Sequence, residues 1–249
     1  YQQQADLAEG LQRSLLTAPP RVEGIQIVVR YQPAAQVAAV GGDWYDAFLQ
    51  PDGTAALIIG DVVGHDTEAA AAMGQLRGLL RGIAYRTGAD PAEVLAGLDA
   101  AMEGLAGSTT ATGIVALLSQ DGAGGHRLRW SCAGHPPPML VHPDGRVEAL
   151  GDDTPDLLLG FDPLTPRTAS ELEAEPGMTL LLYTDGLVER RGQSIDEGLA
   201  LLTTTLQELA VDGIGPDALA DALLRRLLPA EPEDDVALVL VRVADRPAR

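Results

Sequence analysis

Residues 54–86 read TAALIIGDVVGHDTEAAAAMGQLRGLLRGIAYR, and this stretch decides the fold class. The apolar run at 54–61 predicts a buried strand, and the alanine-rich segment 67–86 predicts a helix. Because Pro51-Asp52-Gly53 is a turn tripeptide, residues 43–49 and the strand after the turn together predict a β-hairpin. An antiparallel hairpin followed by a helix indicates an α+β protein.

Similar patterns extend in both directions along the chain. A second helix is predicted from Pro91, because Asp90-Pro91-Ala92-Glu93 supplies an N-cap, a proline at N1 and an acidic N3. Apolar or alternating runs between Asp-Gly and Pro-Gly turns predict further strands, and we expect the middle of the chain to be a β-meander. The other predicted strands are 25–31, 112–119, 126–133, 138–142, 146–150, 168–173, 178–184 and 235–243, and the other helices are about 196–210 and 216–228. Strands alternating with pairs of helices predict helices packed outside antiparallel sheets.

The first twenty residues form a separate unit in this prediction. Leu7, Leu11 and Leu15 recur at helical spacing, and Pro19-Pro20 ends the helix. No linker long enough to divide 21–249 is found, so we expect an entry helix in 1–20 and one compact domain in 21–249. Because the chain begins with Tyr1 in place of Met, we expect it to be part of a longer protein.

The composition argues against several classes of function. The 249 residues include 17 arginines, no lysine and 36 acidic residues, so the formal net charge is −19. This balance leaves no basic surface for nucleic acid or for an anionic membrane. The apolar runs are far shorter than the ~20 residues that a membrane span requires. The single cysteine, Cys132, excludes an internal disulfide and fits a reducing compartment such as the cytoplasm.

Four aspartates lie at the ends of predicted strands, next to glycine or a turn: Asp43, Asp61, Asp185 and Asp234. Each one alone is typical of a turn. Together, they predict carboxylates gathered at one edge of the sheets, where their mutual repulsion requires shared protons or a cation. All-oxygen ligation without histidine or cysteine suits Mg²⁺ or Mn²⁺ and argues against zinc or copper.

Six sequence blocks, in order, carry a resemblance that covers about residues 7–243. They are GGDWYDAF, IIGDVVGHDTEAAAAMGQLRGLLR, TATGIVALL, SCAGHPPPML, LLLYTDGLVERR and DDVALVLVRV. In these blocks the chain resembles the SpoIIE/RsbU-type branch of the metal-dependent protein phosphatases, relatives of the protein phosphatase 2C (PPM) family. The resemblance implies a four-layer α-β-β-α sandwich that holds two Mn²⁺ or Mg²⁺ ions in a cleft at one end of the paired sheets.

The resemblance also implies ligands by position. Asp61 would bridge the two ions, and Val62 would lend its backbone carbonyl. Asp235 occupies a position that the family fills with a supporting polar residue. The implied carboxylate ligands are Asp43, Asp61, Asp185 and Asp234.

The implied reaction is hydrolysis of phosphoserine or phosphothreonine on a protein by water, without a phosphoenzyme. Cys132 is no nucleophile in this interpretation, because it lies in an apolar strand. The implied substrate is a phosphorylated STAS-type anti-sigma-factor antagonist of a bacterial partner-switching pathway. Two alternatives stay open: a non-catalytic module that only binds a partner, and a hydrolase of small phosphate esters.

Three other polar residues have open roles. We favour a structural role for His65 over general acid catalysis, because eukaryotic relatives carry their histidine two residues earlier. Asp66 stands where the family usually has glycine, and we prefer a helix N-cap to a second contact with the metals. His135, before three prolines, is expected to be a turn residue. No arginine lies between Tyr31 and Phe48, so the metals would do most of the phosphate binding.

The leucine stripe of the entry helix resembles the helix that joins a sensor domain to the phosphatase in this family. The stripe therefore predicts docking on the domain, dimerisation with a second copy, or both.

Overall fold

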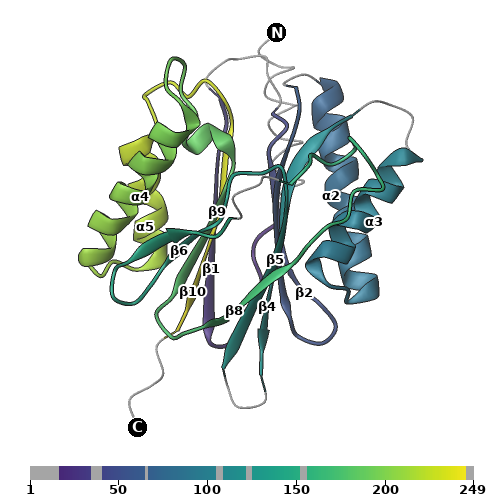
Figure 1. The fold of residues 1–249 in the computed structure, drawn as a ribbon. Coiled ribbons are helices and arrows are strands. Elements are labelled where there is room, and N and C mark those ends of the chain that lie inside the picture. The colour runs from purple at the N-terminus through teal and green to yellow at the C-terminus, as the bar shows by residue number, and fades with distance from the viewer. Residues whose placement is uncertain are drawn as a thin grey trace.

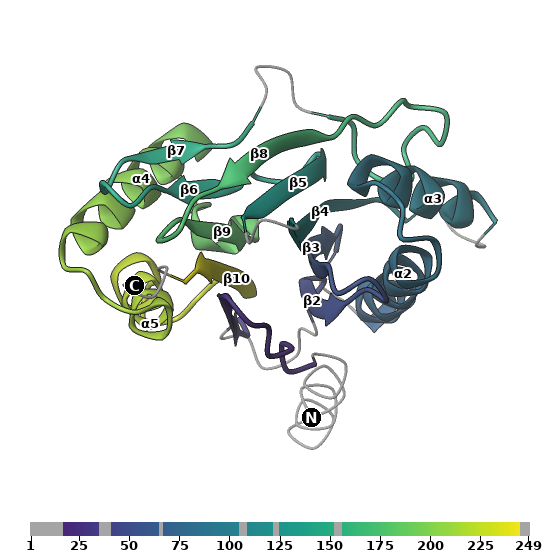
Figure 2. The same ribbon diagram turned by 90° about the horizontal axis from the view of Figure 1, so that it is seen from below.

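The computed structural model describes residues 17–34, 41–64, 67–104, 109–121, 125–151 and 156–244. They form two antiparallel sheets that lie face to face, with two helices on the outer side of each sheet (Figure 1). Seen from below, the four layers follow one another across the molecule (Figure 2). The expected four-layer sandwich is therefore confirmed. The predicted entry helix with Leu7, Leu11 and Leu15 lies outside the described residues, as do His65 and Asp66.

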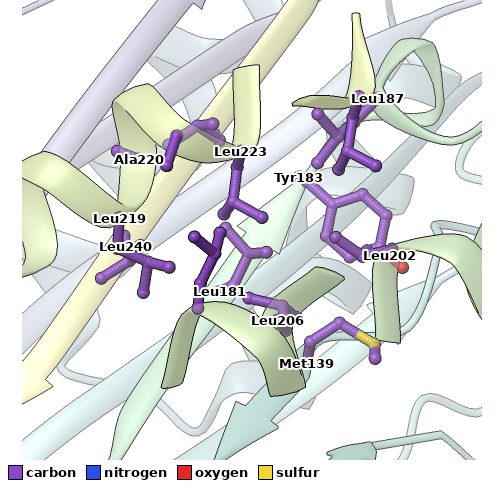
Figure 3. Packing of buried hydrophobic residues seen from close by; sticks show 14 of the residues in the cluster. Met139, Leu181, Tyr183, Leu187, Leu202, Leu206, Leu219, Ala220, Leu223 and Leu240 are labelled. Carbon is purple, nitrogen blue, oxygen red and sulfur yellow. The ribbon is translucent and has the colours of Figure 1, made fainter. Parts of the chain in front are cut away.

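The first sheet is built from both ends of the domain. Its strand order is β1 (Ile25–Gln32), β10 (Val236–Val243), β9 (Thr179–Tyr183), β6 (Met139–Val141) and β7 (Val147–Ala149). Helices α4 (Ile195–Val211) and α5 (Pro216–Leu227) cover its outer face. Figure 3 shows this layer, where the ring of Tyr183 lies beside Leu187 and Leu202 among the leucines of both helices.

The second sheet contains the hairpin predicted around Pro51-Asp52-Gly53. Its strand order is β2 (Trp44–Leu49), β3 (Ala55–Val62), β4 (Ala111–Gln120), β5 (His126–Ala133) and β8 (Ser170–Ala174). Helices α2 (Thr67–Thr87) and α3 (Pro91–Glu103) cover the outer face. The predicted cap of α3 is confirmed, since the Asp90 side chain accepts a hydrogen bond from the Ala92 amide.

Strands of both sheets are apolar on two faces because each sheet lies between helices and the other sheet. In β10, Leu238 and Leu240 face the helices, whereas Val239 and Val241 face the second sheet. The same alternation along β3 directs Ile59, and with it Asp61, toward the first sheet. The inner face of β3 therefore changes from core to carboxylate at the end of the strand.

The expected meander in the middle of the chain is wrong. After β5, residues 134–138 cross to the other sheet, where the β6–β7 hairpin pairs with β9, and β8 then returns to pair with β5. Turn signals identify strands and local hairpins, but the choice of sheet depends on long-range pairing. The strand and helix bounds agree with the predicted ones within two residues, and the short 3₁₀ helix η1 (Asp185–Leu187) was not predicted.

Within the described ranges, no helix combines the length and the hydropathy needed to cross a bilayer.

Candidate metal centre

Three of the four predicted carboxylates meet at one end of the sandwich. Asp43 directly precedes β2, Asp61 lies near the end of β3, and Asp185 begins η1, separated from the end of β9 by one residue. One carboxylate oxygen from each of the three lies within 4.8 Å of the other two. The second sheet supplies Asp43 and Asp61, and the first sheet supplies Asp185, so the cluster spans the gap between the sheets.

Two glycines before Asp43 let the chain approach this cluster closely. A Cβ atom on Gly42 would lie 2.3 Å from the carbonyl oxygen of Val62 and 2.7 Å from Oδ1 of Asp61. A Cβ atom on Gly41 would lie 1.0 Å from Oδ2 of Asp235. No real Cβ contact is that short, so the Gly-Gly-Asp sequence is a steric requirement of the site.

Thr184 fixes the buried carboxylate of Asp43. Its hydroxyl donates to Oδ2 of Asp43 at 2.6 Å and accepts from the amide of Ala237 at 2.9 Å. Thr184 was not predicted from the sequence. Its only signal was its place immediately before Asp185, at the end of an apolar strand. The hydroxyl connects the second sheet's acid to β10 of the first sheet.

Asp234, Asp235 and Val62 lie around the cluster in different ways. Asp234 is outside the three-oxygen group, but its negative charge raises the pKa of Asp61 and of Asp185. Asp235 is buried and accepts from the Tyr31 hydroxyl at 2.7 Å and from the Ala34 amide at 2.8 Å. Its observed contacts therefore hold the segment that follows β1. The Val62 amide donates to the Gly42 carbonyl at 3.2 Å.

The negative charges of the three aspartates favour protonation of their carboxylates or binding of a cation. Burial is the largest cause that raises the pKa of all three acids, and the charges of neighbouring aspartates raise it further. The pKa of Asp61 rises to about 7 and that of Asp185 to about 6, and the pKa of the fully buried Asp43 is also raised well above its usual value.

The donor set fits a hard divalent cation. The ion pairs within the described residues involve other acids, so no arginine neutralises the three carboxylates. Carboxylate oxygens without nitrogen or sulfur donors are typical ligands of Mg²⁺ and Mn²⁺. The three aspartates could thus hold such an ion and lose their mutual repulsion.

His135 is buried near this end and Cys132 is partly buried, and both are hydrogen-bonded. The Cys132 thiol donates to the His135 carbonyl at 3.2 Å, and burial raises the pKa of the thiol to about 11. Burial lowers the pKa of His135 to about 4, and both of its ring nitrogens are hydrogen-bonded. The expected structural roles of both residues agree with these contacts.

Comparisons with known proteins agree with this fold and identify the family. The sequence profile of the family described as Stage II sporulation protein E (SpoIIE) matches residues 51–244. The chain therefore belongs to the SpoIIE family of PP2C-type serine/threonine phosphatases.

Three relatives illustrate the range of similarity. The solved structure of the RsbU and RsbW domains of Rv1364c from Mycobacterium tuberculosis has a TM-score of 0.78 and 30% identity, and the match covers 94% of this chain and 64% of that one. RsbX in complex with magnesium has a TM-score of 0.67 and 16% identity, with coverage of 91% and 99%. Protein IcfG of Synechocystis sp. is 28% identical over 197 residues, which are 69% of this chain and 30% of IcfG. The chain thus spans less than a third of IcfG.

Proposed function

We propose that this chain uses two Mn²⁺ or Mg²⁺ ions to hydrolyse phosphoserine or phosphothreonine on a signalling protein. The observation that carries the proposal is the convergence of Asp43, Asp61 and Asp185 within 4.8 Å, at the ends of two packed sheets, in a chain of the SpoIIE family. The magnesium in the RsbX structure, which has the same fold, supports the choice of metal.

In this proposal, Asp43, Asp61, Asp185 and Asp234 hold the ions together with the Val62 carbonyl. Such ions supply a water of lowered pKa and neutralise the charge of the phosphoryl group. Thr184 keeps Oδ2 of Asp43 in one orientation, and Gly42 allows the Val62 carbonyl to lie beside Asp61. Because the carboxylates have raised pKa values, the acids must give up protons when they become ligands.

Water is the nucleophile in this mechanism. Cys132 is the single cysteine of the chain, and its thiol is bonded to a carbonyl and has a raised pKa. A thiol that stays neutral is a poor nucleophile, because the thiolate is the reactive form. No covalent enzyme intermediate is therefore required, and a thiol-alkylating reagent should leave turnover unchanged.

A cavity of about 520 Å³ adjoins the cluster and is suited to a phosphorylated side chain and its flanks. Asp185 and Asp234 lie on its wall, and Arg190 and Arg191 belong to its lining. Arg190 is bonded to the carbonyls of Gly186 and Leu227, so it shapes the wall. Arg191 is 83% exposed and pairs with Glu233 at 3.0 Å, an exposed contact that a phosphate can replace at small cost.

For the substrate, we propose a phosphorylated STAS-type anti-sigma-factor antagonist in the cytoplasm of a bacterium. The Rv1364c structure, in which an RsbU domain shares a chain with an RsbW domain, supports this assignment by analogy. Nucleic acid and anionic membranes are not proposed as partners, because the chain has 36 acidic residues against 17 arginines.

Turnover of a phosphorylated STAS protein and of a small aryl phosphate is expected to require Mn²⁺ or Mg²⁺. Excess chelator should abolish both reactions, because the carboxylates alone provide no nucleophile or positive charge. The measurement is phosphate release with each metal, with chelator, and after thiol alkylation as the control.

The outcomes separate the candidate functions. Turnover in excess chelator would contradict the proposed mechanism. Turnover of the aryl phosphate alone would favour a hydrolase of small phosphate esters, and binding of the phosphoprotein without turnover would favour a partner-binding module.

We also propose that residues 1–20 are a regulatory segment of the phosphatase domain 21–249, which follows a sensor domain in the full-length protein. Thr17 supports this proposal, because its hydroxyl donates to Oδ1 of Asp46 at 3.0 Å. Asp46 is fully buried in β2 and pairs with Arg77 and Arg81 of α2 at 3.3 and 2.7 Å. Thr17, the first described residue of this segment, is thus hydrogen-bonded to the strand that directly follows Asp43.

Leu11→Glu combined with Leu15→Glu is expected to change basal turnover or self-association, because three leucines on one face of the predicted helix need an apolar partner. Sedimentation and turnover are the measurements. Gln2→Glu with Arg13→Glu, which adds negative charge to the opposite face of the predicted helix, is the control. If the leucine variant equals the parent in mass and rate, the segment is a passive linker.

A further inference from the structure

His135 lies on the crossing between the two sheets. The chain leaves β5 of the second sheet at Ala133 and enters β6 of the first sheet at Met139. Gly134 turns the chain with a φ of 63°, a conformation that favours glycine. The His135 ring that follows is buried, with 7% of the residue exposed.

Each ring nitrogen of His135 binds a different sheet. Nε2 lies 2.9 Å from the carbonyl oxygen of Tyr183, in the first sheet, and must donate, because a carbonyl only accepts. Nδ1 of the neutral ring lies 2.7 Å from Oγ1 of Thr112, in the second sheet, and accepts a hydrogen bond from that hydroxyl. The two contacts fix one tautomer and join β4 to β9 through a single side chain.

The Tyr183 carbonyl needs this donor because proline occupies the opposite position. The Thr184 amide donates to Ala237 of β10, so the Tyr183 carbonyl points to the other side of the strand, toward β6. Continuing the pairing of Met139 with Leu181 would place Pro137 opposite Tyr183. Pro137 has no N–H group, and a buried carbonyl without a donor is costly. His135 supplies the missing hydrogen bond.

Both partners of His135 are next to metal-site residues. Thr112 is the direct cross-strand neighbour of Asp61, so their side chains share the inner face of the second sheet. Tyr183 precedes Thr184, which binds Asp43, and lies two residues before Asp185. A change in the contact between His135 and either strand would therefore shift one acid relative to another.

We infer that His135 is a positioning residue of the metal centre, which sets the separation of Asp61 and Asp185 by bonding β4 and β9 together. The inference rests on the proposed function, because it assigns these acids to a metal site. It also explains why a histidine is used at a turn, since a neutral imidazole accepts at one nitrogen and donates at the other.

Thr112 offers the mildest test. Thr112→Val keeps the shape of the side chain but removes the donor to Nδ1, whereas Thr112→Ser keeps the hydroxyl. Thr112→Val and His135→Leu should weaken Mn²⁺ binding by about 10–100-fold, as loss of groups that orient metal ligands does. Thr112→Ser and His135→Gln, whose amide can both accept and donate, should bind Mn²⁺ within about threefold of the parent, well below that loss of about 10–100-fold. Isothermal titration of the metal-free full chain with Mn²⁺ measures the affinities.

Leu118→Ala separates positioning from stability. Leu118 is a buried residue of the same strand as Thr112, toward the other end of the inter-sheet core. This control should lower the melting temperature at least as much as Thr112→Val and leave Mn²⁺ affinity unchanged. Parental Mn²⁺ affinity in Thr112→Val, or equal weakening in Leu118→Ala, would overturn the inference even if His135→Leu does not fold. Failure of the parent itself to bind Mn²⁺ would overturn the proposed function and the inference with it.

Discussion

Asp61→Asn is expected to lower Mn²⁺-dependent turnover of the phosphoprotein by more than about 100-fold and to weaken Mn²⁺ binding at least as much. Removal of a direct metal ligand should reduce the affinity more than removal of a residue that only orients a ligand. The physical reason is the position of Asp61, whose carboxylate lies within 4.8 Å of both Asp43 and Asp185. Glu173→Gln, which removes one exposed charge from β8, is the matched control and should behave as the parent.

The same substitution should stabilise the metal-free protein at neutral pH. The pKa of Asp61 is raised from 3.8 to about 7 by burial and by the Asp185 charge. A raised carboxyl pKa contributes stability that is present below pH 3.8 and is lost as the pH rises through about 7, because the unfolded chain releases the proton first. Each pKa unit corresponds to about 1.4 kcal/mol. Asp61→Asn removes this loss.

Urea unfolding of the metal-free parent, Asp61→Asn and Glu173→Gln at pH 5 and pH 8 checks this expectation. The parent and Glu173→Gln should both lose stability between the two pH values, and Asp61→Asn should lose less. Mn²⁺ should raise the melting temperature of the parent much more than that of Asp61→Asn, because only binding to the folded state stabilises it. Identical pH slopes and identical Mn²⁺ shifts in parent and variant would show that Asp61 belongs to no metal site.

Much of the local structure could be predicted because its causes are local. The hairpin of β2 and β3 follows from its turn tripeptide, and the start of α3 follows from Asp90 and Pro91. The position of β8 could not be predicted in this way, because it pairs with β5 across an intervening hairpin of the other sheet. The family resemblance implies the four layers, whereas hydrophobic periodicity alone predicts only that helices cover antiparallel sheets.

Part of the candidate site could likewise be predicted from the sequence, and part could not. The convergence of Asp43, Asp61 and Asp185 could be predicted, because each lies at a strand end next to glycine or a turn. Carboxylates at such strand ends share one edge of the sheets. The contacts of Thr184 with Asp43 and of His135 with Tyr183 join residues 141 and 48 positions apart. Such contacts depend on how the two sheets face each other, and the spacing of residues within one segment does not predict this packing.

Arg167→Met is expected to destabilise the protein by about 3–5 kcal/mol, because it leaves a buried carboxylate without its cation. Nε and Nη2 of Arg167 bind Oδ2 of Asp99 in α3 at 2.9 and 2.7 Å, and both side chains are 1% exposed. Oδ1 of Asp99 accepts from the Gly160 amide at 2.9 Å. Arg167 also donates to the carbonyl of Leu157, so one guanidinium ties the segment 157–167 to α3.

Arg127→Met provides the matched control, because Arg127 pairs with Glu171 at 3.8 Å with both side chains more than half exposed. An exposed pair of this kind contributes about 0–1 kcal/mol. Combining Arg167→Met with Asp99→Leu should recover part of the lost free energy of unfolding, since no charge is then buried unpaired. Recovery should be incomplete, because the Leu157 carbonyl and the Gly160 amide both lose a partner. Urea unfolding of the four proteins measures these differences, and equal losses for Arg167→Met and Arg127→Met would contradict the assignment of Asp99 and Arg167 as a buried clasp.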